Sequence, residues 1–168
     1  MKNRFCILFA GAIGSSKTPI ANYLSGILGL PSLSNDIIRR EIVEDLKKFS
    51  QEKYLKRRDE RLLDILRSGS SFIFDASIDR SWEQVKTELE KYGYEFFIIS
   101  LNPSKKFLKK LWEVKNYSDL EALDRTFVEH KTFLNKYQSL IGLNITDKTF
   151  NSRIQLSFDA ITKWMKIK

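Results

Sequence analysis

Residues 11–18 carry the strongest chemical signal in the chain. They read Gly11, Ala12, Ile13, Gly14, Ser15, Ser16, Lys17 and Thr18. The stretch follows an apolar run and precedes helix-forming residues, which is the context of a phosphate-binding loop. Backbone N–H groups of such a loop, and the N-terminus of the following helix, bind an anion. In this pattern Lys17 reaches the β- and γ-phosphates of a nucleotide, and the Thr18 hydroxyl binds Mg²⁺.

Ser16 departs from the usual pattern G-x-x-x-x-G-K-[S/T], which has glycine before the lysine. If this position needs a positive φ, a serine there costs roughly 1–2 kcal/mol. Its hydroxyl could instead donate a hydrogen bond to a phosphate. The alternative interpretation of the whole stretch is a glycine-containing turn followed by a chance Lys-Thr pair.

Asp36 and Arg39 form a second candidate pair, three residues apart on an expected helix. A carboxylate here can take the proton of a substrate hydroxyl, and a nearby arginine can hold a phosphate or stabilise transferred charge. The structural alternative is an acid favoured by the helix dipole beside a solvated arginine. Because the pair follows a phosphate loop, the functional interpretation is preferred.

Asp75 ends a short apolar run and is the third candidate. A carboxylate at the tip of a buried strand suits Mg²⁺ binding, either directly or through water. Substrate positioning is a second possible role, and capping of the next turn is the structural alternative. Arg80 follows five residues later and is a candidate substrate contact.

The segment at 105–130 is the expected lid. Phosphoryl transfer needs cations over the phosphates and exclusion of water. Arg125 is the only arginine between Arg80 and Arg153, so it is the predicted lid cation. Lys109 and Lys110 are weaker candidates, since a solvated helix face also explains the lysines.

Alternating strands and helices are expected to position these residues. Short apolar runs predict strands at 4–10, 31–34, 72–75, 94–101 and 142–146. Helical spacing predicts helices at 19–28, 36–48, 52–67, 81–92, from 105, from 120, and 150–165. The pattern indicates an α/β domain with a parallel sheet, in which ligands bind beyond the carboxyl ends of the strands. His130 and Cys6 are predicted to be structural.

Composition fits one globular domain and excludes several classes. The 168 residues include 29 Lys plus Arg, 21 Asp plus Glu, one Cys and one His, with a net charge of +8. One cysteine excludes an intramolecular disulfide and a cysteine-based zinc site. The apolar run at 5–10 is too short for a signal core of roughly 7–15 residues or a membrane span of ~18, so a cytoplasmic location is expected. The charge suits nucleic acid or a phosphorylated substrate, and solubility explains it equally well.

Three segments together resemble the small P-loop kinases: 11–25 (GAIGSSKTPIANYLS), 33–42 (LSNDIIRREI) and 68–77 (SGSSFIFDAS). The chain is most similar to the AAA-type predicted kinases that are related to polynucleotide 5′-hydroxyl kinases and zeta-toxin-like kinases. The resemblance covers the first half of the chain. Beyond it only the alternation of elements matches.

The resemblance implies one three-layer, nucleoside-kinase-like P-loop NTPase domain over residues 1–168. It implies a five-stranded parallel sheet of order 2-3-1-4-5 and a helical lid. ATP would be the donor, with Mg²⁺, and the acceptor a hydroxyl of a small molecule or a nucleic-acid 5′ end. Asp36 would be the base, Arg39 a substrate or phosphate contact, and Arg125 the lid arginine. Neither the acceptor nor the oligomeric state follows from it.

A nucleotide-binding switch, or a slow NTPase with little transfer activity, is the rival from another class. Ser16 motivates it, together with a lid that lacks the arginine pair of many related kinases. The leading interpretation is an ATP- and Mg²⁺-dependent phosphotransferase acting on a hydroxyl.

Overall fold

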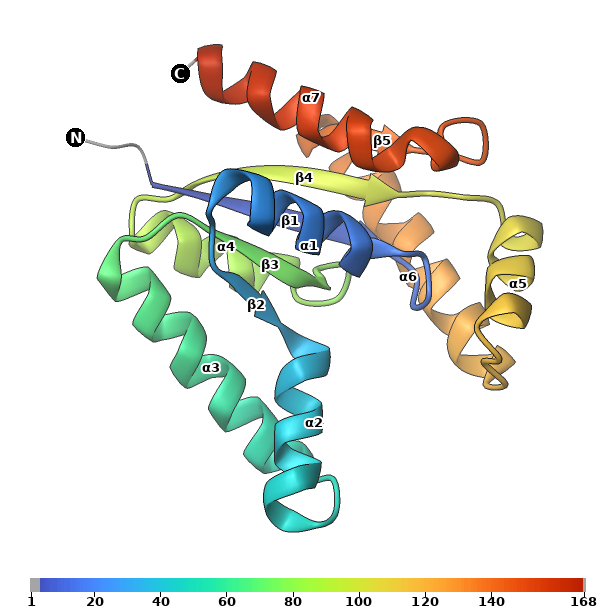
Figure 1. Cartoon of the computed structure of the whole chain (residues 1–168), viewed down its shortest axis with the longest axis horizontal. Helices are drawn as coiled ribbons and strands as arrows, with labels where there is room; N and C mark the ends of the chain where they lie inside the picture. The colour runs from blue at the N-terminus through green and yellow to red at the C-terminus, as the bar shows by residue number, and fades with distance from the viewer. Residues whose placement is uncertain (1–3, 168) are drawn as a thin grey trace.

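A five-stranded parallel sheet of order β2-β3-β1-β4-β5 forms the centre of the molecule (Figure 1). The computed structural model describes residues 4–167. The strands are β1 (Phe5–Gly11), β2 (Ser32–Ser34), β3 (Phe72–Ser77), β4 (Glu95–Leu101) and β5 (Ile141–Ile145). This order confirms the fold that the resemblance implies. Among the described residues, no helix has both the length and the apolar character needed to cross a bilayer.

Helices cover both faces of the sheet. They are α1 (Lys17–Leu28), α2 (Asn35–Leu46), α3 (Gln51–Ser68), α4 (Trp82–Lys91), α5 (Lys105–Val114), α6 (Leu120–Tyr137) and α7 (Arg153–Ile167), with 3₁₀ turns at Gln138–Leu140 and Phe150–Ser152. Helices α1 and α7 pack on one face, and residues of α2, α3, α4 and α6 pack on the other (Figure 1). The result is the three-layer arrangement expected when every strand is followed by a crossover helix.

Strand β1 divides the core into its two halves because its side chains alternate between the two faces. Ile7 and Phe9 join the cluster under α1 and α7, whereas Cys6 and Leu8 join the opposite cluster. Cys6 is fully buried, as the sequence predicts. A strand buried on both faces reads as a nearly continuous apolar run, which is the sequence of β1.

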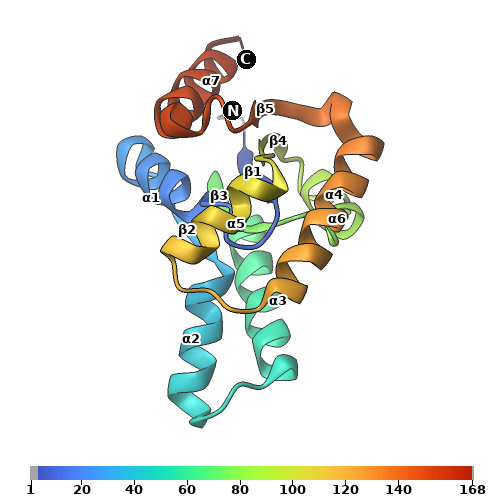
Figure 2. The ribbon, with the colours of Figure 1, turned by 90° about the vertical axis from the view of Figure 1, so that its right-hand side faces the viewer.

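A third, smaller core lies beyond the carboxyl ends of the strands. It joins the glycine-rich loop to the expected lid, through Ala12, Leu108, Trp112, Ala122 and Leu123. Helix α5 lies in front of this end of the sheet, and the segment after it leads into α6 (Figure 2). Residues of α5 and α6, which lie in the segment expected to be a lid, therefore pack directly on the loop.

The carboxyl end of β3 is irregular where it pairs with β1. Leu8 pairs with Phe74, but the next residue, Phe9, pairs with Ser77. The two extra residues of β3 include Asp75, so the chain leaves the sheet close to the glycine-rich loop. The helix predicted over 36–48 ends earlier, at Leu46, because Lys47 adopts a left-handed conformation with φ 57°.

Candidate functional site

The turn from β1 to α1 is built on two glycines that close packing requires. Gly14 has φ 76°, and a Cβ there would lie 2.3 Å from Trp112 Nε1. Gly11 has φ 146°, and a Cβ there would lie 2.8 Å from the Leu101 carbonyl oxygen. Both positions therefore combine a backbone that favours glycine with space for no side chain.

Ser16 adopts the left-handed conformation that the usual glycine would adopt, with φ 71° and ψ 41°. The strain considered from the sequence is therefore present, at roughly 1–2 kcal/mol for a non-glycine residue. The Ser16 hydroxyl accepts a hydrogen bond from Lys115 Nζ at 3.2 Å. The same ammonium donates to the Gly14 carbonyl at 2.8 Å. Lys115 thus ties the serine and the loop together.

Lys17 folds back over the loop. Its ammonium donates to the carbonyls of Gly11 (2.9 Å) and Ala12 (2.8 Å) and to Ser15 Oγ (3.2 Å). The Lys17 pKa is lowered from 10.5 to about 8, chiefly by burial and to a smaller extent by the charge of Lys115.

Three carboxylates, those of Asp79, Asp75 and Asp36, oppose this shift of the Lys17 pKa through their negative charge. The ammonium therefore lies where three acidic side chains converge.

Thr18 and Asp75, the two residues predicted to bind Mg²⁺, are in contact. Thr18 Oγ1 donates to Asp75 Oδ1 at 3.2 Å. Burial raises the pKa of the Asp75 carboxyl, and hydrogen bonds from Thr18 and Ser34 act in the opposite direction. No group of three or more His, Cys, Asp or Glu side chains in residues 4–167 could hold a metal ion alone. Two oxygens still fit Mg²⁺, because this ion usually keeps several waters and takes ligands from phosphates.

Asp36 lies in the first turn of α2 and is exposed. Ser34 at the end of β2 pairs with Asp75 of β3, so α2 and Asp36 begin at the same edge of the sheet as Asp75. The charge of Asp36 acts on the pKa of both Lys17 and Asp75. Arg39 lies one turn further along α2. Its guanidinium stacks 4.4 Å from the ring centroid of Tyr54, on α3.

A cavity of about 320 Å³ adjoins these residues. It opens between α2, α3, α4 and the end of β3, and its lining includes Asn35, Arg39, Arg58, Ser77, Arg80 and Phe74. The structure therefore brings two predicted substrate contacts, Arg39 and Arg80, to one cavity. Arg80 also pairs with Glu129 at 3.4 Å, with 70% of its side chain exposed.

Arg125, the predicted lid cation, is exposed on α6 and does not contact the loop. Other lid residues do. Trp112 Nε1 donates to the Ile13 carbonyl at 3.0 Å, and Thr126 Oγ1 accepts the Ile13 N–H at 3.2 Å. With Lys115, they form the contact between lid and loop. The sequence gives little sign of this, because a tryptophan on an apolar helical face is typical of packing.

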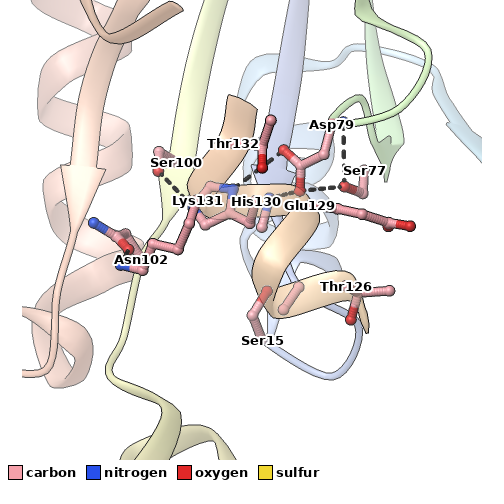
Figure 3. Close-up of polar contacts among 12 residues, drawn as sticks. Ser15, Ser77, Asp79, Ser100, Asn102, Thr126, Glu129, His130, Lys131 and Thr132 are labelled. Atoms are coloured by element: carbon pink, nitrogen blue, oxygen red, sulfur yellow. Dashed lines mark hydrogen bonds and ion pairs between the residues drawn. The ribbon is translucent and has the colours of Figure 1, made fainter. Parts of the chain in front are cut away.

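A buried chain of polar groups supports the first residue of the loop (Figure 3). Asp79 Oδ2 accepts the Gly11 N–H at 3.1 Å and the Ser77 hydroxyl at 3.0 Å. Asp79 Oδ1 lies 3.1 Å from His130 Nδ1, and His130 Nε2 lies 3.2 Å from Ser100 Oγ. His130 is 2% exposed, so it links α6 to the sheet rather than facing a ligand.

Asp79 is a further site residue that sequence reasoning missed, in addition to Lys115, Trp112 and Thr126. Its only sequence signal is its place shortly after a strand end that already carries Asp75.

The geometry gathers donor groups for an anion at one end of the sheet. The loop, the N-terminus of α1 and the Lys17 ammonium face the same region, and unsatisfied N–H groups at a helix N-terminus favour an anion. Asp36 lies beside this region, next in sequence to Asn35, which lines the cavity. An anion held by the loop and a second molecule in the cavity would therefore meet near a carboxylate.

Comparison with solved structures shows the same fold in several kinases. A candidate kinase from Chloroflexus aurantiacus aligns with a TM-score of 0.67 and 17% identity, covering 97% of this chain and 98% of that one. The APS kinase CysC of Mycobacterium tuberculosis, in complex with AMPPNP and APS, aligns with a TM-score of 0.59, 16% identity and coverage of 95% and 98%. A gluconokinase from Sinorhizobium meliloti aligns with a TM-score of 0.63 and 12% identity, covering 99% of this chain and 96% of that one. No family model and no curated protein sequence matches the chain.

Proposed function

We propose that this chain is a phosphotransferase that moves the γ-phosphate of ATP, with Mg²⁺, to a hydroxyl group. The observation that carries the proposal is the convergence of the loop lysine, Lys17, with the Thr18–Asp75 pair and Asp36 at one end of the sheet. Similar solved structures that include an APS kinase and a gluconokinase support it. So does the resemblance of the sequence to polynucleotide 5′-hydroxyl and zeta-toxin-like kinases.

The donor phosphates would be bound by Lys17 and by N–H groups of residues 11–18 other than those of Gly11, Ile13 and Ser15, which already donate within the protein. Lys17 would exchange its loop carbonyls for phosphate oxygens and neutralise charge that develops during transfer. Thr18 and Asp75 would hold Mg²⁺, which supplies charge neutralisation at the phosphates when bound. The catalytic contribution of these residues is positioning and electrostatics, as is general for phosphoryl transfer.

The acceptor would enter from the cavity side. Asp36 takes the proton of the acceptor hydroxyl while the acceptor oxygen forms a bond to the γ-phosphorus, and the bond from phosphorus to the ADP oxygen breaks. Arg39 and Arg80 line the cavity and would hold the rest of the acceptor. Arg125 is the lid cation that the resemblance implies. Lys115 is the lid cation that contacts the loop.

The test separates nucleotide binding from transfer. We expect Lys17→Ala to weaken ADP binding by at least about tenfold, since it removes charge-assisted hydrogen bonds. Asp36→Asn should keep ADP binding within about twofold but abolish transfer of labelled γ-phosphate to a pool of nucleosides, 5′-hydroxyl oligonucleotides, sugars and cell-extract metabolites. Asp64→Asn, an exposed change on α3, is the matched control.

Unchanged ADP affinity in Lys17→Ala would contradict the phosphate loop. Transfer of label by Asp36→Asn at the rate of the unsubstituted protein would contradict the role of Asp36 as the base. Label that appears only in 5′-hydroxyl oligonucleotides would identify a nucleic-acid end as the acceptor.

A nucleotide-binding switch or slow NTPase is the second candidate. The observation that favours it is the strained Ser16 in a loop whose carbonyls already bind Lys17 and Lys115. Such a protein would bind ADP with Lys17 dependence, yet label would leave ATP only as free phosphate, or not at all. The same labelled-ATP assay therefore decides between the two candidates.

A further inference from the structure

Two N–H groups at the start of the glycine-rich loop donate to side chains of the protein. The Gly11 N–H donates to Asp79 Oδ2 at 3.1 Å, and the Ile13 N–H donates to Thr126 Oγ1 at 3.2 Å. Each backbone N–H is a single donor, so neither group is left for a phosphate. These two bonds therefore serve to hold the loop in place, and both lead to helix α6.

The first of them reaches α6 through a buried pair of side chains. Asp79 Oδ1 lies 3.1 Å from His130 Nδ1, and these side chains are only 4% and 2% exposed (Figure 3). A carboxylate only accepts hydrogen bonds, so we assign the proton to Nδ1. The other carboxylate oxygen accepts the Gly11 N–H and the Ser77 hydroxyl. His130 thus fixes the carboxylate that holds Gly11.

The second bond comes directly from α6. Thr126 and His130 are four residues apart, so they share one face of the helix. The Thr126 hydroxyl donates to the Ala122 carbonyl at 2.8 Å, which leaves its lone pairs to accept the Ile13 N–H. One turn of α6 therefore supports two loop residues, Gly11 and Ile13.

This turn of α6 is itself attached to the sheet. His130 Nε2 lies 3.2 Å from Ser100 Oγ on β4, and Lys131 Nζ donates to Asn102 Oδ1 at 2.5 Å, just after β4. Moving the turn away from the loop would leave buried polar groups without partners, which is costly. Residues 126–130, the end of the segment expected to be a lid, are thereby fixed to the sheet.

Gly11 needs this support because its other bond is to the loop lysine. Its carbonyl accepts from Lys17 Nζ at 2.9 Å. In the proposed function Lys17 turns to a phosphate oxygen, and Gly11 then keeps the bond to Asp79. Gly11 has φ 146° and no side chain that could hold it by packing. A loop that stays in place during this exchange loses less conformational entropy when the phosphates bind.

We infer that Asp79, His130 and Thr126 are positioning residues for the donor nucleotide. From one face of α6 they hold Gly11 and Ile13, so that the remaining loop N–H groups meet the phosphates in a fixed arrangement. They act on the nucleotide through the loop and not by contact. This inference rests on the proposed function, because it concerns binding of the same donor.

The first test uses the free protein and needs no nucleotide. His130 is the only histidine of the chain, so its ring nitrogen resonances are assigned without ambiguity. We expect a protonated Nδ1 and slow solvent exchange of the Gly11 and Ile13 amide hydrogens. His130→Leu should speed exchange at Gly11 by at least about tenfold, and Thr126→Val should do so at Ile13. Each variant should affect the other amide less.

ADP calorimetry then measures what the support contributes to binding. We expect His130→Leu to weaken ADP binding by about tenfold and Thr126→Val by about threefold. His130→Asn should restore most of the affinity lost in His130→Leu, because the asparagine N–H group takes the place of Nδ1 toward Asp79. A side chain that only fills space would be replaced better by leucine than by asparagine.

Two controls separate positioning from general stability. Thr132 on α6 is exposed and donates to the Val128 carbonyl at 3.0 Å, as Thr126 does to Ala122, so Thr132→Val is the match for Thr126→Val.

Tyr94→Phe removes a buried hydroxyl that donates to the Ile65 and Ser70 carbonyls at the opposite end of the sheet. Both controls should keep ADP affinity within about twofold, even where urea denaturation shows a loss of stability.

Four results would overturn the proposal. They are an Nδ1 without a proton, unchanged Gly11 exchange in His130→Leu, full ADP affinity in both His130→Leu and Thr126→Val, and an equal loss of affinity in either control. If His130→Leu does not fold, Thr126→Val carries the same test at Ile13. Absence of ADP binding by the unsubstituted protein would contradict the proposed function, and the amide exchange rates would still decide whether α6 holds the loop.

Discussion

The proposed donor side and the proposed acceptor side, both at the carboxyl end of the sheet, differ in how their polar groups are partnered. On the donor side, Lys17 and Lys115 donate to loop oxygens, and Asp79 accepts the Gly11 N–H. On the acceptor side, Arg39 has aromatic partners only, and Asn35 Oδ1 is buried without a partner. The loop is thus held by bonds within the protein, whereas the guanidinium of Arg39 at the cavity has no protein hydrogen-bond acceptor in residues 4–167.

Breaking the donor side should have the largest effect. We expect Gly14→Ala to lower the free energy of unfolding by about 3 kcal/mol, because its Cβ meets Trp112 Nε1 and the residue must stay at φ 76°. Nucleotide binding should be lost with it. Urea denaturation and ADP calorimetry measure both.

Gly29→Ala is the control for Gly14→Ala, since Gly29 has φ 63° but no atom within 4 Å of an added Cβ. Gly29→Ala should lower the free energy of unfolding only by the backbone strain, roughly 1–2 kcal/mol, and should leave ADP affinity unchanged. Equal destabilisation by the two changes would show that the contact with Trp112 does not hold the loop.

Lys115 and Arg125 are the two candidate cations of the expected lid, and substituting each one shows which of them supports ADP binding. We expect Lys115→Gln to weaken ADP binding by about tenfold, because it removes a cation that already lies on the loop at Gly14 and Ser16. Arg125→Gln should change ADP affinity by less than about twofold, because Arg125 is exposed and makes no hydrogen bond or ion pair with residues 11–18. Lys106→Gln, an exposed change on α5, is the control. A larger loss of ADP affinity in Arg125→Gln than in Lys115→Gln would instead support Arg125 as the lid cation, as the resemblance implies.

The pH dependence should give the smallest effect. The Lys17 pKa is about 8 in the free protein, so its ammonium is charged below pH 8 and neutral above it. A bound phosphate adds negative charge and raises that pKa, so binding takes up a proton between the two values and ADP affinity falls as pH rises. We expect a loss of about fourfold between pH 7.0 and 8.5 from the change in charged fraction.

Calorimetry of ADP binding in two buffers of different ionisation enthalpy measures the proton uptake. Lys17→Arg is the control, since arginine stays charged throughout this range. Persistence of the same uptake in Lys17→Arg would assign it to another group.

Much of the fold was predictable because its strands have one dominant signal. β1 and β4 are buried on both faces, and their apolar runs give nearly the observed bounds. The end of α2 was less predictable. It depends on Lys47 adopting a left-handed conformation, which no residue-type preference indicates.

The candidate site was predictable only where contacts are local in sequence. The loop residues and the place of Asp75 follow from strand-end patterns, and the structure brings them together. Lys115 and Asp79 contact the loop from 101 and 68 residues away, and such contacts depend on tertiary packing. The irregular pairing of β1 with β3 is equally absent from the local pattern, although it precedes Asp79.

The hydrogen bonds from Lys17 and Lys115 to loop carbonyls would make ligand binding depend on the number of phosphate groups in the ligand. Lys17 donates to the carbonyls of Gly11 and Ala12, and Lys115 donates to that of Gly14, so a phosphate that binds either ammonium has to replace these bonds. A ligand with one phosphate can replace one set of these bonds and leaves the other in place, whereas a longer polyphosphate can replace both. The loop is already ordered, so little conformational entropy is lost on binding. In the proposed function, a triphosphate would thus engage both lysines, and a monophosphate only one of them, whatever the base or ribose.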